Sequence, residues 1–266
     1  MSPTVPARAQ SGFSIIELIV ALVLAASLFA ALLLWFARPL EALLESQRQA
    51  AAADHAERAM ARFSAEIAGA LPNSVRVACA GRCLELIPVV DAADYRVASP
   101  GNTLDFGSAD GEFDVLMPLS AAPAAGLQVV INNLNAGSTG NLSAYSADAD
   151  NNRSSVVAGG SAAQIHIAPK QYPLPSPTQR FYIVATPVSY VCDPAPSGGT
   201  VRRYAGYAIQ PNQPVDTSLG DLLADGVVDC RFDVVDERLV AWRLHVNAGS
   251  GEAIAMFAQP RIVNLP

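Results

Sequence analysis

The four cysteines of this sequence are the side chains whose chemistry is most readily defined. Cys79 and Cys83 flank the short segment Ala-Gly-Arg, and Cys192 and Cys230 lie far downstream. In an exported protein an even number of cysteines favours disulfides, whereas in the cytosol free thiols and metal ligands are commoner. The sequence alone allows several connectivities, and we favour Cys79 with Cys83 and Cys192 with Cys230. A zinc site is disfavoured because the usual C-x2-C spacing is absent, so no metal site is expected.

The sequence contains two acidic clusters, of which one is a candidate for calcium binding. The segment Asp148-Ala-Asp150-Asn151-Asn152 resembles the start of a calcium loop, but Arg153 and Gly159 occupy the positions of its glycine and its glutamate. We therefore expect a solvated turn and no cofactor, and we keep Ca2+ as the one candidate ion. The second cluster is interpreted as an exposed hairpin face and consists of Asp105, Asp110, Glu112 and Asp114.

The histidines and the lysine lie outside the common enzyme motifs. None of His55, His166 and His245 lies in an H-E-x-x-H sequence or beside a nucleophile motif. The single lysine, Lys170, follows a proline, so there is no P-loop, and no G-x-S-x-G motif occurs. A triad built from distant residues would need a pocket that gathers a histidine, a serine or cysteine and a carboxylate. We expect no enzyme, and a net charge of -7 without a Lys/Arg-rich run argues against nucleic acid.

The N-terminal segment bears on the compartment. Residues 1–12 are polar, with Arg8 as their only charged side chain. Residues 18–37 form an uncharged apolar run, which as a helix spans about 30 Å, the thickness of one hydrocarbon core. A cleavable signal peptide has a shorter apolar core, followed by a small-x-small cleavage site. A generic membrane anchor fits the length of the run. Whether the segment is more than an anchor depends on the residues that precede the run.

The residues Gly12-Phe13-Ser14-Ile15-Ile16-Glu17-Leu18 resemble the class III signal of type IV prepilins. The resemblance implies that a prepilin peptidase cuts after Gly12 on the cytoplasmic side of the membrane and methylates Phe13. Glycine suits this position because the absence of a side chain lets the peptidase approach the scissile bond closely. Residues 1–12 would then be a leader peptide, and a long helix over 13–71 would cross the membrane at about residues 15–37.

Glu17 lies at the edge of the apolar run, where an unpaired carboxylate is costly. The resemblance implies that this glutamate approaches the α-amine of Phe13 on a neighbouring subunit during filament assembly. The tip pseudopilin of secretion systems lacks the glutamate, so by analogy the present chain should have a neighbour above it. The alternative is a residue that snorkels to the headgroups of a simple anchor.

Beyond the membrane segment the pattern predicts a helix that carries a β-rich head. Apolar residues recur at helical spacing over 56–67, and Gly69 followed by Leu71-Pro72 predicts the end of the helix. Arg62 and Glu66 form an opposite-charge pair on its wetter face. Residues 72–266 alternate short apolar runs with turn residues, which predicts an antiparallel sheet and an α+β fold.

Within this head, residues 135–162 are rich in Gly, Ser, Asn and Asp, and they predict a flexible surface loop. The expected strands are 74–77, 83–89, 103–106, 114–116, 127–131, 164–167, 181–186, 188–191, 201–209, 239–246 and 253–257.

Short segments of the head carry a second, finer resemblance: 71–77, 83–88, 113–116, 187–192 and 202–204. They are similar to MshO-like minor pilins of mannose-sensitive haemagglutinin pili. This implies an inner-membrane protein with a cytoplasmic N-terminus and a periplasmic head, which then enters a pilus and acts in assembly initiation or as a minor filament subunit. The implied partners are prepilin peptidase, the lipid bilayer, the inner-membrane assembly platform, and major and other minor pilins. PilW-like minor pilins, J-type pseudopilins of type II secretion and a membrane-tethered binding module are the alternatives.

Overall fold

The computed structural model describes residues 14–214, 220–236, 238–247 and 253–264. The chain divides into two compact units, Met1–Ala50 and Ala51–Pro266. The predicted α+β class is confirmed, because the described residues form one long helix followed by strands that pair antiparallel. The elements are α1 (Ile15–Ala68), the 3-10 helix η1 (Cys79–Gly81), β1 (Arg76–Ala78), β2 (Cys83–Leu86), β3 (Val89–Asp94), β4 (Asp110–Asp114), β5 (Gln128–Ile131), β6 (Arg153–Ser155), β7 (Gln164–Lys170), β8 (Arg180–Val184), β9 (Val188–Asp193), β10 (Gly199–Ala205), β11 (Asp221–Val234), β12 (Val240–Asn247) and β13 (Ala253–Ala258).

α1 is a single helix that passes through Pro39 and belongs to both units. It ends at Ala68, immediately before Gly69, where the sequence predicts the end of the helix. The N–H of Gly69 donates to the carbonyl oxygen of Ala65 at 3.2 Å, and Ala70 then forms a bridge with Pro88. Glycine and the following proline stop the helix because neither favours a helix interior.

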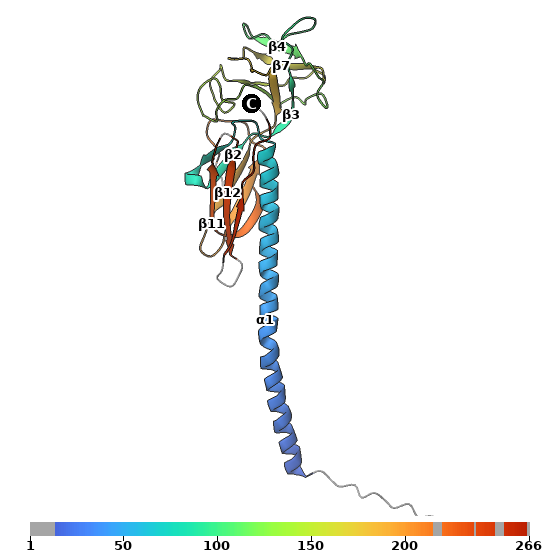
Figure 1. Cartoon of the computed structure of the whole chain (residues 1–266), viewed down its shortest axis with the longest axis vertical. Helices are drawn as coiled ribbons and strands as arrows, with labels where there is room; N and C mark the ends of the chain where they lie inside the picture. Colours follow the sequence, from blue (N-terminus) through green and yellow to red (C-terminus); the bar gives the residue numbers. More distant parts are fainter. Residues whose placement is uncertain (1–13, 215–219, 237, 248–252, 265–266) are drawn as a thin grey trace, which may run out of the picture. The chain divides into compact units, whose positions relative to one another are not determined.

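The C-terminal part of α1 packs on a seven-stranded sheet in the order β1-β2-β9-β10-β11-β12-β13. The predicted apolar stripe of the helix is buried in the core under this sheet. Phe63 is fully buried, and its ring centroid lies 5.2 Å from that of Tyr190, 5.8 Å from Phe232 and 4.9 Å from Trp242. Figure 1 shows β2, β11 and β12 running alongside this part of the helix. Contact with the sheet therefore stabilises this half of α1 more than helix propensity does.

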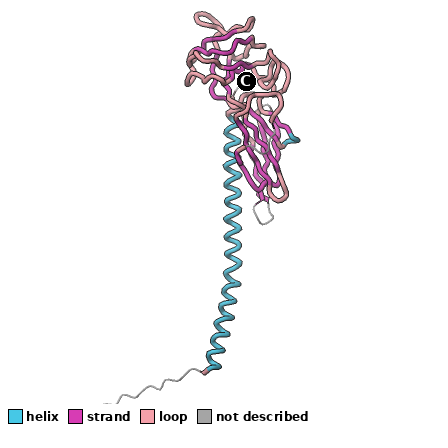
Figure 2. The backbone as a smooth tube through the Cα atoms, turned by 180° about the vertical axis from the view of Figure 1, so that it is seen from behind, coloured by secondary structure: helices cyan, strands magenta, loops and turns pink. Residues whose placement is uncertain are grey.

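Residues 87–187 are an insertion between two paired strands of that sheet. β2 and β9 are hydrogen-bonded neighbours, and their register ends with Leu86 opposite Val188. The insertion carries a four-stranded sheet, β3-β8-β5-β6, and the two-stranded β4-β7. One of its cores, which includes Phe113 and Phe181, contains no described residue of α1. We call residues 87–187 the insertion lobe, and Figure 2 shows its strands gathered beyond the C-terminal end of the helix.

The sequence predicts no strand over β11, which is the longest strand of the described chain. The register between β10 and β11 shifts twice, and the register between β11 and β12 shifts between Val227 and Asp229. Gly226 lies within this irregular part of β11 with a φ of 70°. Such bulges break the apolar alternation that identifies a strand in a sequence.

The strand expected at residues 103–106 is absent, because this segment forms a loop. The N–H of Asp105 donates to Asp110 Oδ2 at 2.9 Å, and Asp105 Oδ1 accepts from the N–H of Gly107 at 2.7 Å. Acidic side chains that bond to nearby main-chain N–H groups compete with strand pairing. These contacts explain the difference.

Residues 135–162 differ from the flexible surface loop that the sequence predicts. They include β6, which pairs with β5, and both Ala144 and Asn152 are fully buried. The N–H of Ala144 donates to Asn133 Oδ1 at 2.8 Å, and Asn152 Nδ2 donates to the same oxygen at 3.3 Å. Part of this segment is therefore packed through polar contacts, whereas 137–141, 147–150 and 157–159 are exposed.

Candidate functional site

The first turn of α1 holds one of the predicted site residues. Gly12 and Phe13 lie outside the described residues, whereas Glu17 lies in the first helical turn with an exposed side chain. Ser14 caps this turn: its Oγ accepts from the N–H of Ile16 at 3.4 Å, and its carbonyl oxygen accepts from the N–H of Glu17 at 3.0 Å. The pair Ser14 and Glu17 has the S-x-x-E spacing of a capping box. The helix therefore starts at Ile15, directly after its cap Ser14, and Glu17 is held near its positive end.

The segment Ile15–Leu33 is an apolar surface without a cover. Its mean hydropathy is 2.7 and none of it is buried, and among the described residues it is the one helical segment long and apolar enough to cross a membrane. Glu17 is its only charged residue. Ser27 Oγ donates to the carbonyl oxygen of Leu24 at 2.9 Å, so its hydroxyl is satisfied within the helix. An exposed apolar surface of this extent requires lipid or the helices of other subunits.

Glu66 joins the C-terminal part of α1 to the seven-stranded sheet. Its carboxylate accepts a hydrogen bond from the Tyr190 hydroxyl at 2.7 Å and bonds from Arg203 Nε at 2.9 and 3.1 Å. The pair with Arg62, expected from the sequence, is also present, at 3.3 Å. Burial, and after it the Glu66 carboxylate, raise the pKa of Tyr190, so the phenol stays protonated and remains a donor. The sequence does not predict the contacts of Glu66 with Tyr190 and Arg203, because these residues lie far along the chain.

Replacing Glu66 by glutamine is expected to lower the free energy of unfolding by about 1–3 kcal/mol. The amide keeps the volume of the side chain but removes the charge that Arg203 and Tyr190 bind, and partly buried partners lose a charge-assisted bond. Glu57→Gln is the matched control, because Glu57 is exposed on the same helix. Thermal unfolding of the detergent-solubilised chain, followed by circular dichroism, measures both variants. Equal stability of the two would contradict an anchoring role for Glu66.

The cysteines form the two disulfides favoured by the sequence. Cys79 and Cys83 close η1 with Cα atoms 5.4 Å apart, and Cys192 links β9 to Cys230 on β11 with Cα atoms 6.2 Å apart. Trp242 Nε1 donates to the sulfur of Cys230 at 3.4 Å. No free cysteine remains in the described parts of the chain, and no group of three or more metal-ligating side chains was found there.

The acidic clusters serve the local structure of the insertion lobe. Asp148 Oδ2 accepts from the N–H of Gly140 at 2.7 Å. Asp114 Oδ2 accepts from the N–H of Asn102 at 2.9 Å, and Glu112 lies 3.3 Å from His166. Each of these carboxylates has a protein donor in contact, so the described geometry gives no support to a calcium loop.

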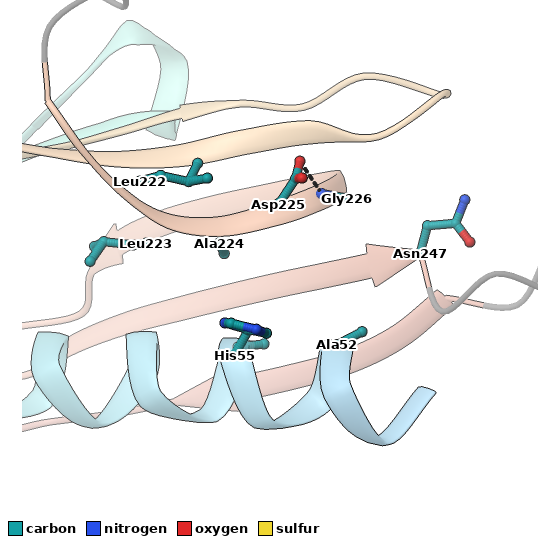
Figure 3. A pocket seen from close by; sticks show the side chains of 9 residues that line it. Ala52, His55, Leu222, Leu223, Ala224, Asp225, Gly226 and Asn247 are labelled. Atoms are coloured by element: carbon teal, nitrogen blue, oxygen red, sulfur yellow. Dashed lines mark hydrogen bonds between the residues drawn. The ribbon is translucent and has the colours of Figure 1, made fainter. Parts of the chain in front are cut away.

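A groove of about 510 Å³ lies between α1 and the irregular part of β11. Figure 3 shows His55 and Ala52 on the helix facing Leu222, Leu223 and Asp225 across it. The groove lies beside the part of β11 in which the register with β10 and β12 shifts. Its lining holds a histidine and a carboxylate, but no serine or cysteine, so a catalytic triad is not formed there.

Comparison with known proteins gives one match. The family model described as a prokaryotic N-terminal methylation motif matches residues 7–33. No curated protein and no solved structure matches the chain. The matched residues contain the predicted cleavage position, Glu17 and the whole of the exposed apolar segment. This motif, together with the apolar helix that carries it, indicates a type IV pilin- or pseudopilin-like protein.

Proposed function

We propose that this protein is an MshO-like minor subunit of a type IV pilus, which acts in assembly initiation or as a minor part of the filament. The observation that carries the proposal is the methylation motif at residues 7–33, whose apolar segment forms the first part of α1. The resemblance of segments 83–88 and 187–192 to MshO-like minor pilins supports the choice of this system. A filament subunit needs a helix that polymerises and a folded head. The apolar segment of α1 suits the first, and the C-terminal part of α1 belongs to the core of the head.

The proposed route begins in the inner membrane, with the N-terminus in the cytoplasm and the head in the periplasm. Two disulfides favour an oxidising compartment for the head. Prepilin peptidase cleaves after Gly12 and methylates Phe13, and the assembly platform then moves the subunit into the filament beside major and other minor pilins. Residues 15–33 leave lipid in this step and pack against the helices of neighbours, so their apolar surface stays out of water.

Glu17 has a defined part in this assembly step. A carboxylate among apolar helices costs several kcal/mol unless a cation pairs with it. Cleavage after Gly12 creates such a cation, the α-amine of Phe13, on every mature subunit. Pairing of Glu17 with this amine on a neighbour would favour one axial position of the subunit over others, since a displaced subunit would bury its carboxylate unpaired.

The experiment is N-terminal mass spectrometry of protein expressed with the peptidase and its pilin partners. Wild type and Glu17→Val should both begin at N-methylated Phe13, but only wild type should be recovered with filaments. Glu57→Val is the control, because it removes a carboxylate from α1 outside the apolar segment. A mature chain that still begins at Met1 would overturn the proposed function. Normal recovery of Glu17→Val would overturn the pairing, and recovery with type II secretion pseudopilins would replace the pilus by that system.

A further inference from the structure

The outermost strand β13 has an unusual composition for the edge of a sheet. It pairs with β12 on one side, and no other described strand pairs with it. Its six residues are Ala-Ile-Ala-Met-Phe-Ala, without a polar side chain. Edge strands in soluble proteins usually carry charges, prolines or bulges, because a free row of main-chain N–H and C=O groups recruits further strands.

Both faces of β13 are apolar. Met256 and Ala258 are partly buried against the core of the seven-stranded sheet, whereas Phe257 is on the other face and 60% exposed. On the same exposed face, the neighbouring strand β12 places Arg243 opposite Phe257 and His245 opposite Ala255. The polar character of this face therefore ends at β12, one strand before the edge.

The opposite edge of the same sheet is protected. β1 has three residues, and the Arg76 guanidinium pairs with Glu85 and donates to the carbonyl oxygens of Gln210 and Pro211. A short strand and a charged side chain are among the usual means of protecting an edge. Among the described residues the two edges thus differ: β1 is short and carries an ion pair, whereas β13 is longer and apolar and is the better suited to accept another strand.

We propose that β13 accepts a β-strand from a neighbouring subunit of the filament, an inference that rests on the proposed function. The main-chain row of β13 selects an extended segment, and its two apolar faces select aliphatic or aromatic side chains at successive positions. Arg261 follows the strand, is exposed and forms no ion pair with the described residues. Charge complementarity therefore adds a carboxylate at one end of the incoming segment.

The small size of the edge favours an occupant that other contacts also hold, as they hold a filament neighbour. A stable interface buries on the order of 1,200–2,000 Å² in total, which is more than addition of one six-residue strand supplies. The incoming segment must be held by other contacts as well, and helix packing within a filament provides them. The strand contact then distinguishes one neighbour from another, because its side chains must fit both faces of β13.

The test compares Phe257→Lys with Met117→Lys in the full chain, expressed with the peptidase and the pilin partners. Both residues are exposed, and Met117 lies outside the strands of the insertion lobe. A lysine on β13 blocks strand addition, so filament-associated Phe257→Lys should fall roughly tenfold or more, the effect of losing a central interface residue. Met117→Lys should match wild type, and thermal unfolding of both variants should match wild type. Recovery of folded Phe257→Lys equal to wild type would overturn the proposal.

A photo-crosslinking amino acid at position 257 identifies the occupant. In isolated filaments it should form an adduct with another pilin subunit, on an apolar peptide flanked by Asp or Glu, while the same probe at 117 gives no such adduct. No adduct at 257, or an adduct with a second copy of this chain, would overturn the proposal. If wild type itself is unprocessed or absent from filaments, the proposed function has failed and this proposal fails with it; N-terminal mass spectrometry of the same sample shows which has happened.

Discussion

Replacing Phe63 by alanine is expected to lower the free energy of unfolding of the head by about 3–5 kcal/mol. Phe63 is fully buried on α1, and its ring contacts three aromatic residues of the sheet, Tyr190, Phe232 and Trp242. The change removes buried apolar surface and creates a cavity that these large rings cannot close by small movements. Chemical unfolding of the detergent-solubilised chain, followed by tryptophan fluorescence, measures the loss. The signal changes because Trp242 becomes exposed to solvent when the helix separates from the sheet.

The matched control makes the same substitution at an exposed site. Phe257→Ala removes an identical ring from a position that is 60% exposed, and it should change the stability by less than about 1 kcal/mol. Phe63→Leu should fall between the two variants, since a smaller cavity remains. Similar losses for Phe63→Ala and Phe257→Ala would show that the helix does not depend on this aromatic cluster for its packing.

Gly12→Val is expected to abolish processing and leave the precursor in the membrane. A branched side chain next to the scissile bond prevents the close approach of the peptidase that the glycine allows. Mass spectrometry should find chains that begin at Met1 and carry no methyl group on Phe13. Ser2→Val, which introduces a branched side chain elsewhere in the leader, should be processed like wild type. Efficient cleavage of Gly12→Val would contradict the proposed cleavage position.

The parts of the fold that the sequence predicts are those with a local cause. The end of α1 follows from Gly69 and Pro72, and the buried face of the helix follows from the spacing of apolar residues such as Phe63 and Ile67. The same holds for the N-terminal motif, in which Gly12, Phe13 and Glu17 lie within a few residues of one another. Patterns of this kind can be interpreted from neighbouring residues alone, without the contacts that the rest of the chain makes.

The parts that the sequence does not predict depend on contacts between distant residues. Glu66 is predicted as a surface partner of Arg62, and its bonds with Tyr190 and Arg203 become apparent only when α1 meets the sheet. Residues 135–162 are polar in composition, yet Asn152 is buried because Asn133 accepts its amide hydrogen. In both cases the partner of the polar side chain comes from another part of the chain, so its sequence neighbours do not reveal the contact.

The insertion lobe also bears on how such a subunit can diverge. Its entry at Leu86 and its exit at Val188 face each other across one register pair, so the lobe is equivalent to a very long hairpin loop. One of its cores contains no described residue of α1, whereas the core that holds the helix draws on β2, β9 and the strands after it. The lobe also holds the segment after α1, because Pro88 bridges Ala70 and Ile87 accepts from the N–H of Leu71. An unrelated cassette that keeps these contacts at residues 87–89 would therefore preserve the helix-binding sheet. Evolution can change what this part of the surface displays while the machinery of polymerisation stays constant.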